Sequence, residues 1–67
     1  MEVFAKRLKE LRKEKGLSQA KLAEVLFVDK SSIAKYETGK STPSVDMLIK
    51  LAEYFKVSTD YLLGLAD

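Results

Sequence analysis

Three polar residues at helical spacing, Lys30, Ser31 and Lys35, are the side chains of this sequence best suited to bind another molecule. Ammonium and hydroxyl groups donate hydrogen bonds, and in a helix over 30–38 these side chains point away from Ile33. A shorter helix candidate precedes this segment, separated from it by a turn of three residues. Two helices joined in this way have the geometry that lays the second one in the major groove of DNA.

Local sequence signals mark both helices of this pair. Ser18 can cap a helix over roughly 19–26, and Leu17 and Leu22 lie at the two positions of a hydrophobic staple. The second helix carries the same signals, with Asp29 as the cap and Val28 and Ile33 as the staple. The pair is therefore predicted from capping as well as from periodicity.

Hydrophobic periodicity predicts three further helices and no strand. They lie at roughly 3–15, from near Ser44 to Phe55, and over a short segment between Ser58 and Gly64. The apolar stripe expected in the fourth helix is Val45, Leu48, Leu51, Ala52 and Phe55. Among the aromatic residues, Phe4, Phe55 and Tyr61 are expected to pack in the core. The predicted fold class is all-α, a compact five-helix bundle in a single domain over residues 1–67.

Composition narrows the possible functions. The 67 residues include no cysteine and no histidine, which excludes disulfides and Cys/His zinc sites, and we expect no metal and no cofactor. Without these residues, and with no carboxylate pair in an evident pocket, an enzyme is a poor candidate. No apolar run approaches the roughly 20 residues that span a bilayer, and no signal peptide is evident. We expect a cytoplasmic protein without a membrane partner or a small-molecule substrate.

Charge is distributed unevenly along the chain. Residues 1–42 carry ten Lys or Arg against six Asp or Glu, whereas residues 43–67 carry two against four. The basic part contains the helix pair. A basic surface favours binding to nucleic acid through attraction to phosphates, although a solvated face of a lysine-rich protein would have the same composition.

Several motifs together resemble the phage repressor and Cro family of helix-turn-helix proteins, also called the Xre family. They are the run from Gly16 to Ala23, then Ile33, Tyr36-Glu37-Thr38-Gly39, Pro43-Ser44 and Asp60-Tyr61-Leu62-Leu63-Gly64. Their order and spacing match the family from about Phe4 to Gly64. The resemblance implies a lambda-repressor-like fold whose third helix enters the major groove, and a transcriptional regulator, most often a repressor, that binds a near-palindromic operator as a dimer.

The resemblance also implies roles for individual residues. Lys30, Ser31 and Lys35 match positions that read bases, where lysine can donate to guanine and serine can serve either kind of base edge. Gln19, at the start of the first helix of the pair, matches a position that meets a backbone phosphate. The other positions that match phosphate contacts are Ser32, Lys40 and Thr42.

Two further positions have structural interpretations. Arg12 and Glu37 match a family pair that joins the first helix to the end of the third, and we expect an ion pair that locks the fold. Phe27 lies in the turn where the family most often has glycine, because the backbone there tends toward a positive φ. Either the turn adopts another geometry, or Phe27 covers enough core to offset a strain of about 1–2 kcal/mol.

The C-terminal segment leaves a second function class open. Its apolar residues Leu62, Leu63 and Leu65, with Tyr54 as an additional contact, are more than one small protomer can cover, so we expect a homodimer that is weak without DNA. The same residues would suit a protein-interaction module, such as an antitoxin that keeps the fold but binds protein. A module of that kind would have no reason to expose Lys30, Ser31 and Lys35.

Overall fold

A computed structural model describes residues 2–67 of the chain. Within this range the chain forms five helices and no strand: α1 (Glu2–Glu14), α2 (Gln19–Leu26), α3 (Lys30–Thr38), α4 (Val45–Phe55) and α5 (Thr59–Leu63). The all-α five-helix prediction is confirmed. None of these helices is long and apolar enough to cross a bilayer.

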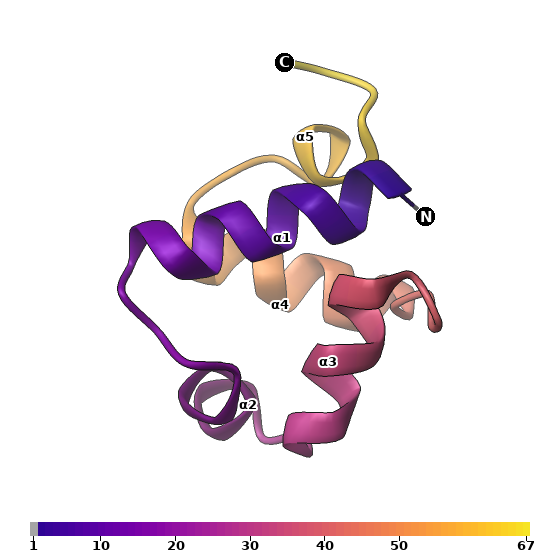
Figure 1. Ribbon diagram of the computed structural model, residues 1–67. Helices are drawn as coiled ribbons and strands as arrows, with labels where there is room; N and C mark the ends of the chain where they lie inside the picture. The colour runs from indigo at the N-terminus through magenta and orange to yellow at the C-terminus, as the bar shows by residue number, and fades with distance from the viewer. Residues whose placement is uncertain (1) are drawn as a thin grey trace.

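Helix α1 crosses the middle of the molecule (Figure 1). Helices α2 and α3 lie on one side of it, α5 lies on the other, and α4 runs behind it. All five helices contribute apolar side chains to one core, whose fully buried members are Phe4, Leu8, Leu22, Ile33, Leu51 and Leu62. Burial of these side chains on one face of each helix leaves the opposite faces free for other contacts.

Serine side chains cap three of the helices as their sequence positions predict. The hydroxyls of Ser18, Ser44 and Ser58 each accept a hydrogen bond from a backbone N–H three residues later, at 3.0, 3.1 and 2.9 Å. Asp29 has the extended backbone of an N-cap at α3, but its side chain makes no capping bond. The boundary of α3 was therefore predicted correctly, whereas the side-chain cap was not.

Two packing expectations were wrong. Val45 is 71% exposed, and Met47 is buried in its place, because α4 begins only at Val45 and turns Met47 inward. Tyr61 is half-buried outside the central core, where the Arg7 guanidinium lies over its ring with 4.2 Å between Cζ and the ring centroid. Phe4 and Phe55 are buried as expected.

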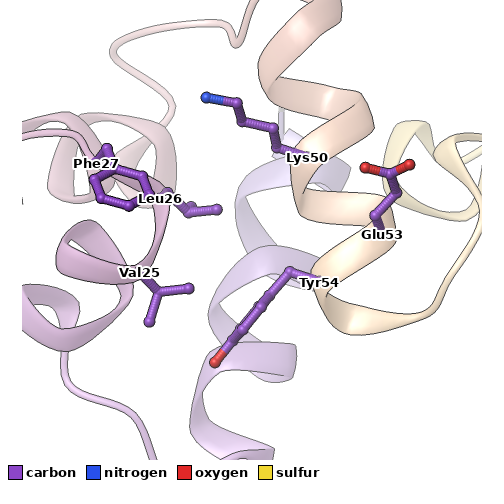
Figure 2. Close-up of a pocket in the computed structure, with 6 residues that line it drawn as sticks. All are labelled: Val25, Leu26, Phe27, Lys50, Glu53 and Tyr54. Atoms are coloured by element: carbon purple, nitrogen blue, oxygen red, sulfur yellow. The ribbon is translucent and has the colours of Figure 1, made fainter.

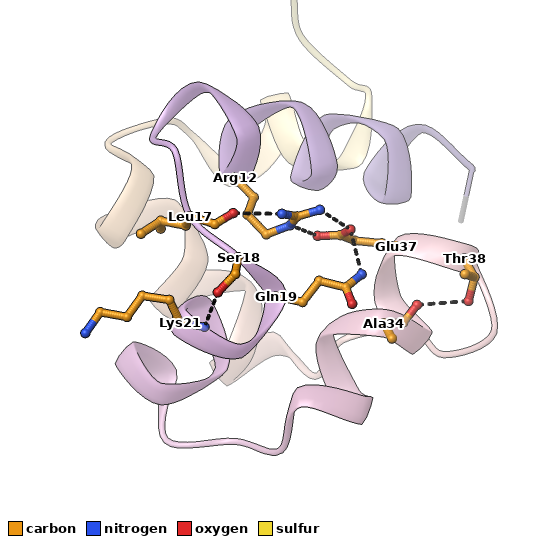
Figure 3. A network of polar contacts seen from close by, with 8 residues as sticks. All are labelled: Arg12, Leu17, Ser18, Gln19, Lys21, Ala34, Glu37 and Thr38. Atoms are coloured by element: carbon orange, nitrogen blue, oxygen red, sulfur yellow. Dashed lines mark hydrogen bonds and ion pairs between the residues drawn. The ribbon is translucent and has the colours of Figure 1, made fainter.

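A buried ion pair joins α1 to α3 (Figure 3). Arg12 Nε donates to Glu37 Oε2 at 2.6 Å, and Nη2 donates to Oε1 at 3.0 Å. The third nitrogen, Nη1, donates to the carbonyl oxygen of Leu17 at 2.7 Å, which also ties down the connection to α2. Hydrogen bonding to the Glu37 carboxylate raises the pKa of Arg12, against the opposing effect of burial. Because this bidentate geometry suits only one placement of α3 against α1, the pair fixes the orientation of α3.

The turn between α2 and α3 differs from both sequence-based expectations. Phe27 keeps the left-handed backbone, with φ 60° and ψ 43°, so the turn has not adopted another geometry. Its side chain is 91% exposed, so it does not cover the core either. The left-handed conformation lets the N–H groups of Phe27 and Val28 bond to the last carbonyls of α2, which is the usual ending of a helix.

Replacing Arg12 with methionine tests the buried ion pair. The change keeps the apolar stem but leaves the carboxylate of Glu37, whose side chain is 2% exposed, without its cation. We expect a loss of about 3–5 kcal/mol in the free energy of unfolding, measured by urea denaturation. Because the raised pKa belongs to a cation, the wild-type contribution is complete below the ordinary arginine pKa and disappears only in strongly alkaline solution.

The matched control for this prediction is Lys21→Met. Lys21 pairs with Glu24 at 3.4 Å, but both side chains are largely exposed. Such a pair contributes little, so we expect a change within about 0.5 kcal/mol. Equal effects of the two substitutions would contradict a special role for the buried pair.

Replacing Phe27 with glycine should stabilise the fold. Glycine relieves a left-handed strain of about 1–2 kcal/mol, and the added freedom of the unfolded chain offsets roughly half of that gain. Lys56, at the end of α4, has a similar backbone, with φ 58°, so Lys56→Gly should raise the melting temperature by a similar amount, measured by thermal denaturation. A lower melting temperature for both variants would show that the left-handed positions are not strained.

Candidate nucleic-acid interface

The outer face of α3 carries the residues that sequence analysis singled out. Lys30, Ser31 and Lys35 are exposed, whereas Ile33 on the opposite face is fully buried. Tyr36 also turns inward, where its ring meets the edge of Phe4 with 6.1 Å between centroids. The three polar side chains therefore share a surface that packing leaves open.

The loop after α3 extends this surface. Gly39 adopts a left-handed backbone, with φ 78°, and the N–H of Lys40 bonds to the Lys35 carbonyl at 2.9 Å. This ending turns the chain sharply away from the helix axis. Lys40 and Thr42 are exposed in the loop, and Ser32 is half-buried in the first turn of α3. The two loop residues lie directly after the helix that carries Lys30, Ser31 and Lys35.

Gln19 has a partner that sequence reasoning missed. Its side-chain Nε2 donates to Glu37 Oε1 at 3.1 Å, so one carboxylate oxygen accepts bonds from both Gln19 and Arg12 (Figure 3). The amide of Gln19 is thereby held at the junction of α1, α2 and α3. The residues are 18 positions apart, and no local pattern connects them. The sequence shows only that Gln19 is the first residue of α2 and that Glu37 lies near the end of α3, which does not predict their contact.

The charges on this surface are mainly positive. Lys30, Lys35 and Lys40 form no ion pair within residues 2–67, since the two pairs found there are Arg12 with Glu37 and Lys21 with Glu24. The exposed anion nearest in sequence is Asp29, and Glu37 is neutralised by Arg12. The lysine ammonium groups are thus available to an anionic partner.

The expected dimer surface is only partly open. Leu62 is 0% exposed and belongs to the core, so it was wrongly assigned to an interface. Its place on the inner face of the short helix α5 explains the burial. Leu63 is half-buried and Leu65 is 75% exposed, and both are available to a second chain.

Arg7 secures the segment that follows α5. Its guanidinium donates to the carbonyl oxygens of Tyr61 and, at 2.6 Å, Ala66. Gly64 lies so close to Val3 of α1 that an added Cβ would come within 2.8 Å of its side chain. These contacts hold the last residues against α1 and leave Leu65 facing outward.

The side chains give no basis for a metal centre in the part of the chain that the structure describes. No group of three or more potential ligands comes together there, and every buried side-chain nitrogen or oxygen in that range has a hydrogen-bond partner. The arrangement is suited to hydrogen bonding and charge attraction at a surface.

Comparison with known proteins agrees with this geometry. The helix-turn-helix family matches residues 8–62. The chain is 42% identical over 65 residues to the uncharacterized HTH-type transcriptional regulator YobD of Bacillus subtilis, covering 97% of this chain and 58% of that protein. It is 44% identical over 61 residues to the HTH-type transcriptional regulator ImmR of the same organism, covering 91% and 48%.

An activator and a solved structure are also similar. The HTH-type transcriptional activator BcrR of Enterococcus faecalis is 40% identical over 61 residues, which cover 91% of this chain and 30% of BcrR. The crystal structure of a transcriptional regulator from Listeria innocua matches with a TM-score of 0.88 and 41% identity, covering 96% of this chain and 60% of that one. The chain thus spans between 30% and 60% of the length of these relatives. It belongs to the helix-turn-helix family of transcriptional regulators, of the repressor and Cro type.

Proposed function

We propose that this chain binds double-stranded DNA sequence-specifically, with α3 in the major groove, and regulates transcription. The observation that carries the proposal is the shared exposure of Lys30, Ser31 and Lys35 on the outer face of α3, free of ion pairs within the described chain. A protein-binding module has no need for such a face. The relatives named as transcriptional regulators support the same function.

The residues of this surface divide into two roles. Lys30, Ser31 and Lys35 read base edges, because they project from the helix that fits the groove. Phosphates are contacted by Lys40 and Thr42 in the loop, by Ser32 in the first turn of α3, and by Gln19 at the start of α2. The exposed N–H groups and the positive end of the α2 dipole favour an anion beside Gln19. Glu37 accepts one N–H of the Gln19 amide and leaves the other for a phosphate oxygen.

A near-palindromic operator requires two copies of the chain. Two recognition helices must lie about 34 Å apart to enter successive major grooves on one side of the duplex. We propose a homodimer formed through Leu63 and Leu65, without the buried Leu62. The apolar area offered by two residues is small, so the dimer is weak in solution and is completed on DNA.

Repression is the mode of regulation that this domain can perform unaided. A domain bound over a promoter excludes RNA polymerase by occupying the site, without any additional contact. We therefore propose that the protein is a repressor. We place it in the cytoplasm, where it would reach the chromosome. If binding to the operator instead activated a reporter gene, the repressor proposal would be wrong, and the protein would act as an activator, as BcrR is named.

Alanine substitutions separate base reading from phosphate binding. Lys35→Ala should weaken binding to a selected operator by roughly 1–3 kcal/mol per half-site and change the preferred base pairs. Lys40→Ala should weaken binding to every duplex and reduce the salt slope by about one unit for each phosphate that the variant no longer neutralises. Affinities are measured by electrophoretic shift on the operator and on a scrambled duplex across a salt series.

Both variants should remain folded, because both side chains are exposed. Equal losses of affinity on the two duplexes for Lys35→Ala would make Lys35 a phosphate-binding residue. If neither variant loses affinity at any salt concentration, the DNA-binding proposal fails, and the protein-interaction alternative takes its place.

Leu65→Glu tests the proposed homodimer. A carboxylate at this exposed position should not disturb the fold, but it would have to be desolvated in an interface between two copies. We expect lower operator affinity and a shallower dependence of binding on protein concentration, because two copies would no longer assist each other on the operator. Unchanged affinity and sedimentation behaviour would rule out this dimer surface.

A further inference from the structure

Phe27 combines two unfavourable features when the chain is considered alone. It has a left-handed backbone, with φ 60° and ψ 43°, which opposes folding for any residue with a Cβ. Its ring is 91% exposed, so burial within the chain does not compensate for the strain. An exposed phenylalanine by itself is ordinary, and Lys56 has the same left-handed backbone, but Phe27 joins that backbone to a large exposed aromatic ring. A contact outside the fold would explain this combination.

A groove lies beside this residue (Figure 2). Val25, Leu26 and Phe27 line it from the end of α2, and Lys50, Glu53 and Tyr54 line it from α4. Its volume is about 290 Å³. None of these residues belongs to the proposed DNA surface, so the groove stays open when α3 is occupied.

On the α4 side of the groove, contacts with neighbouring side chains hold the Tyr54 ring in place. The Tyr54 ring packs edge-on against Phe55, with 5.0 Å between centroids. Lys15 Nζ lies over the Tyr54 ring, 4.7 Å from its centroid. The groove therefore presents a fixed aromatic wall opposite the exposed ring of Phe27, as an incoming aromatic side chain would require.

The charges at the rim indicate what fills the groove. Lys50 and Glu53 lie three residues apart on α4, both are exposed, and neither forms an ion pair within residues 2–67. A purely acidic or purely basic partner would meet one like charge. A second copy of the same surface, related by a two-fold axis, brings Lys50 opposite Glu53 twice, because residues contact each other reciprocally in such an interface.

We propose that this groove is a self-association surface in which two copies exchange their Phe27 side chains. Each ring enters the groove of the other copy, and each Lys50 faces Glu53 across the two-fold axis. The groove contains neither Leu63 nor Leu65, and it takes in Tyr54, which the sequence had grouped with them, so the surface links dimers instead of forming them.

Sedimentation equilibrium without DNA tests this surface directly. The measurements use the full chain carrying Leu65→Glu, which removes the other proposed contact. Phe27→Gly in this background should raise the dissociation constant for self-association by about tenfold or more, because the central aromatic anchor is removed. Lys56→Gly is the matched control: it relieves the same kind of left-handed backbone away from the groove and should leave the constant unchanged.

Both glycine variants should keep the helical circular dichroism of the parent, so unfolding cannot mimic the expected result. The proposal is overturned if the parent is monomeric at all concentrations, if Phe27→Gly associates like the parent, or if Lys56→Gly weakens association equally.

A charge exchange tests the two-fold pairing. Lys50→Glu and Glu53→Lys should each weaken association severalfold, because each places like charges opposite one another. The double variant restores opposite charges and should associate like the parent. Failure of the double variant to recover, or single variants that associate normally, would overturn the proposed arrangement.

Discussion

The buried ion pair between Arg12 and Glu37 is the constraint on which the arrangement of the binding surface depends. A carboxylate with 2% of its side chain exposed must be neutralised and hydrogen-bonded, and only one placement of α3 against α1 brings both of its oxygens to the guanidinium. That placement turns Lys30 and Lys35 outward. The orientation of α3 therefore follows from electrostatics in the interior, while apolar packing supplies most of the cohesion.

The Glu37 carboxylate also connects α2 to α1 and α3. Glu37 accepts a bond from Gln19, and Arg12 donates to the carbonyl oxygen of Leu17 just before α2. One ion pair thus sets the positions of α1, α2 and α3 together. A helix pair that is to fit a groove must keep a fixed internal geometry, and here polar contacts at the junction reinforce the packing of both helices.

Much of the fold could be predicted from the sequence because its helix boundaries have local causes. Serine caps and glycine stops act within a few residues of their own positions, so α2 and α5 were located correctly. Contacts distant in sequence had no such signal, as with Gln19 and Glu37. Leu62 and Leu63 are neighbours on a helix too short to show periodicity, so their separation into buried and accessible residues required the structure. The exposed ring of Phe27 likewise depends on how α2 lies against α4.

Selection of bound sequences from a random duplex pool tests the central claim most directly. If α3 reads bases from a dimer, repeated rounds should enrich two inverted half-sites whose centres lie about 10 base pairs apart, and the retained affinity should fall steeply with salt. A pool that stays random after selection, although the protein is folded and retains DNA, would show binding to the phosphate backbone alone. A pool from which the protein retains nothing at low salt would contradict DNA binding altogether.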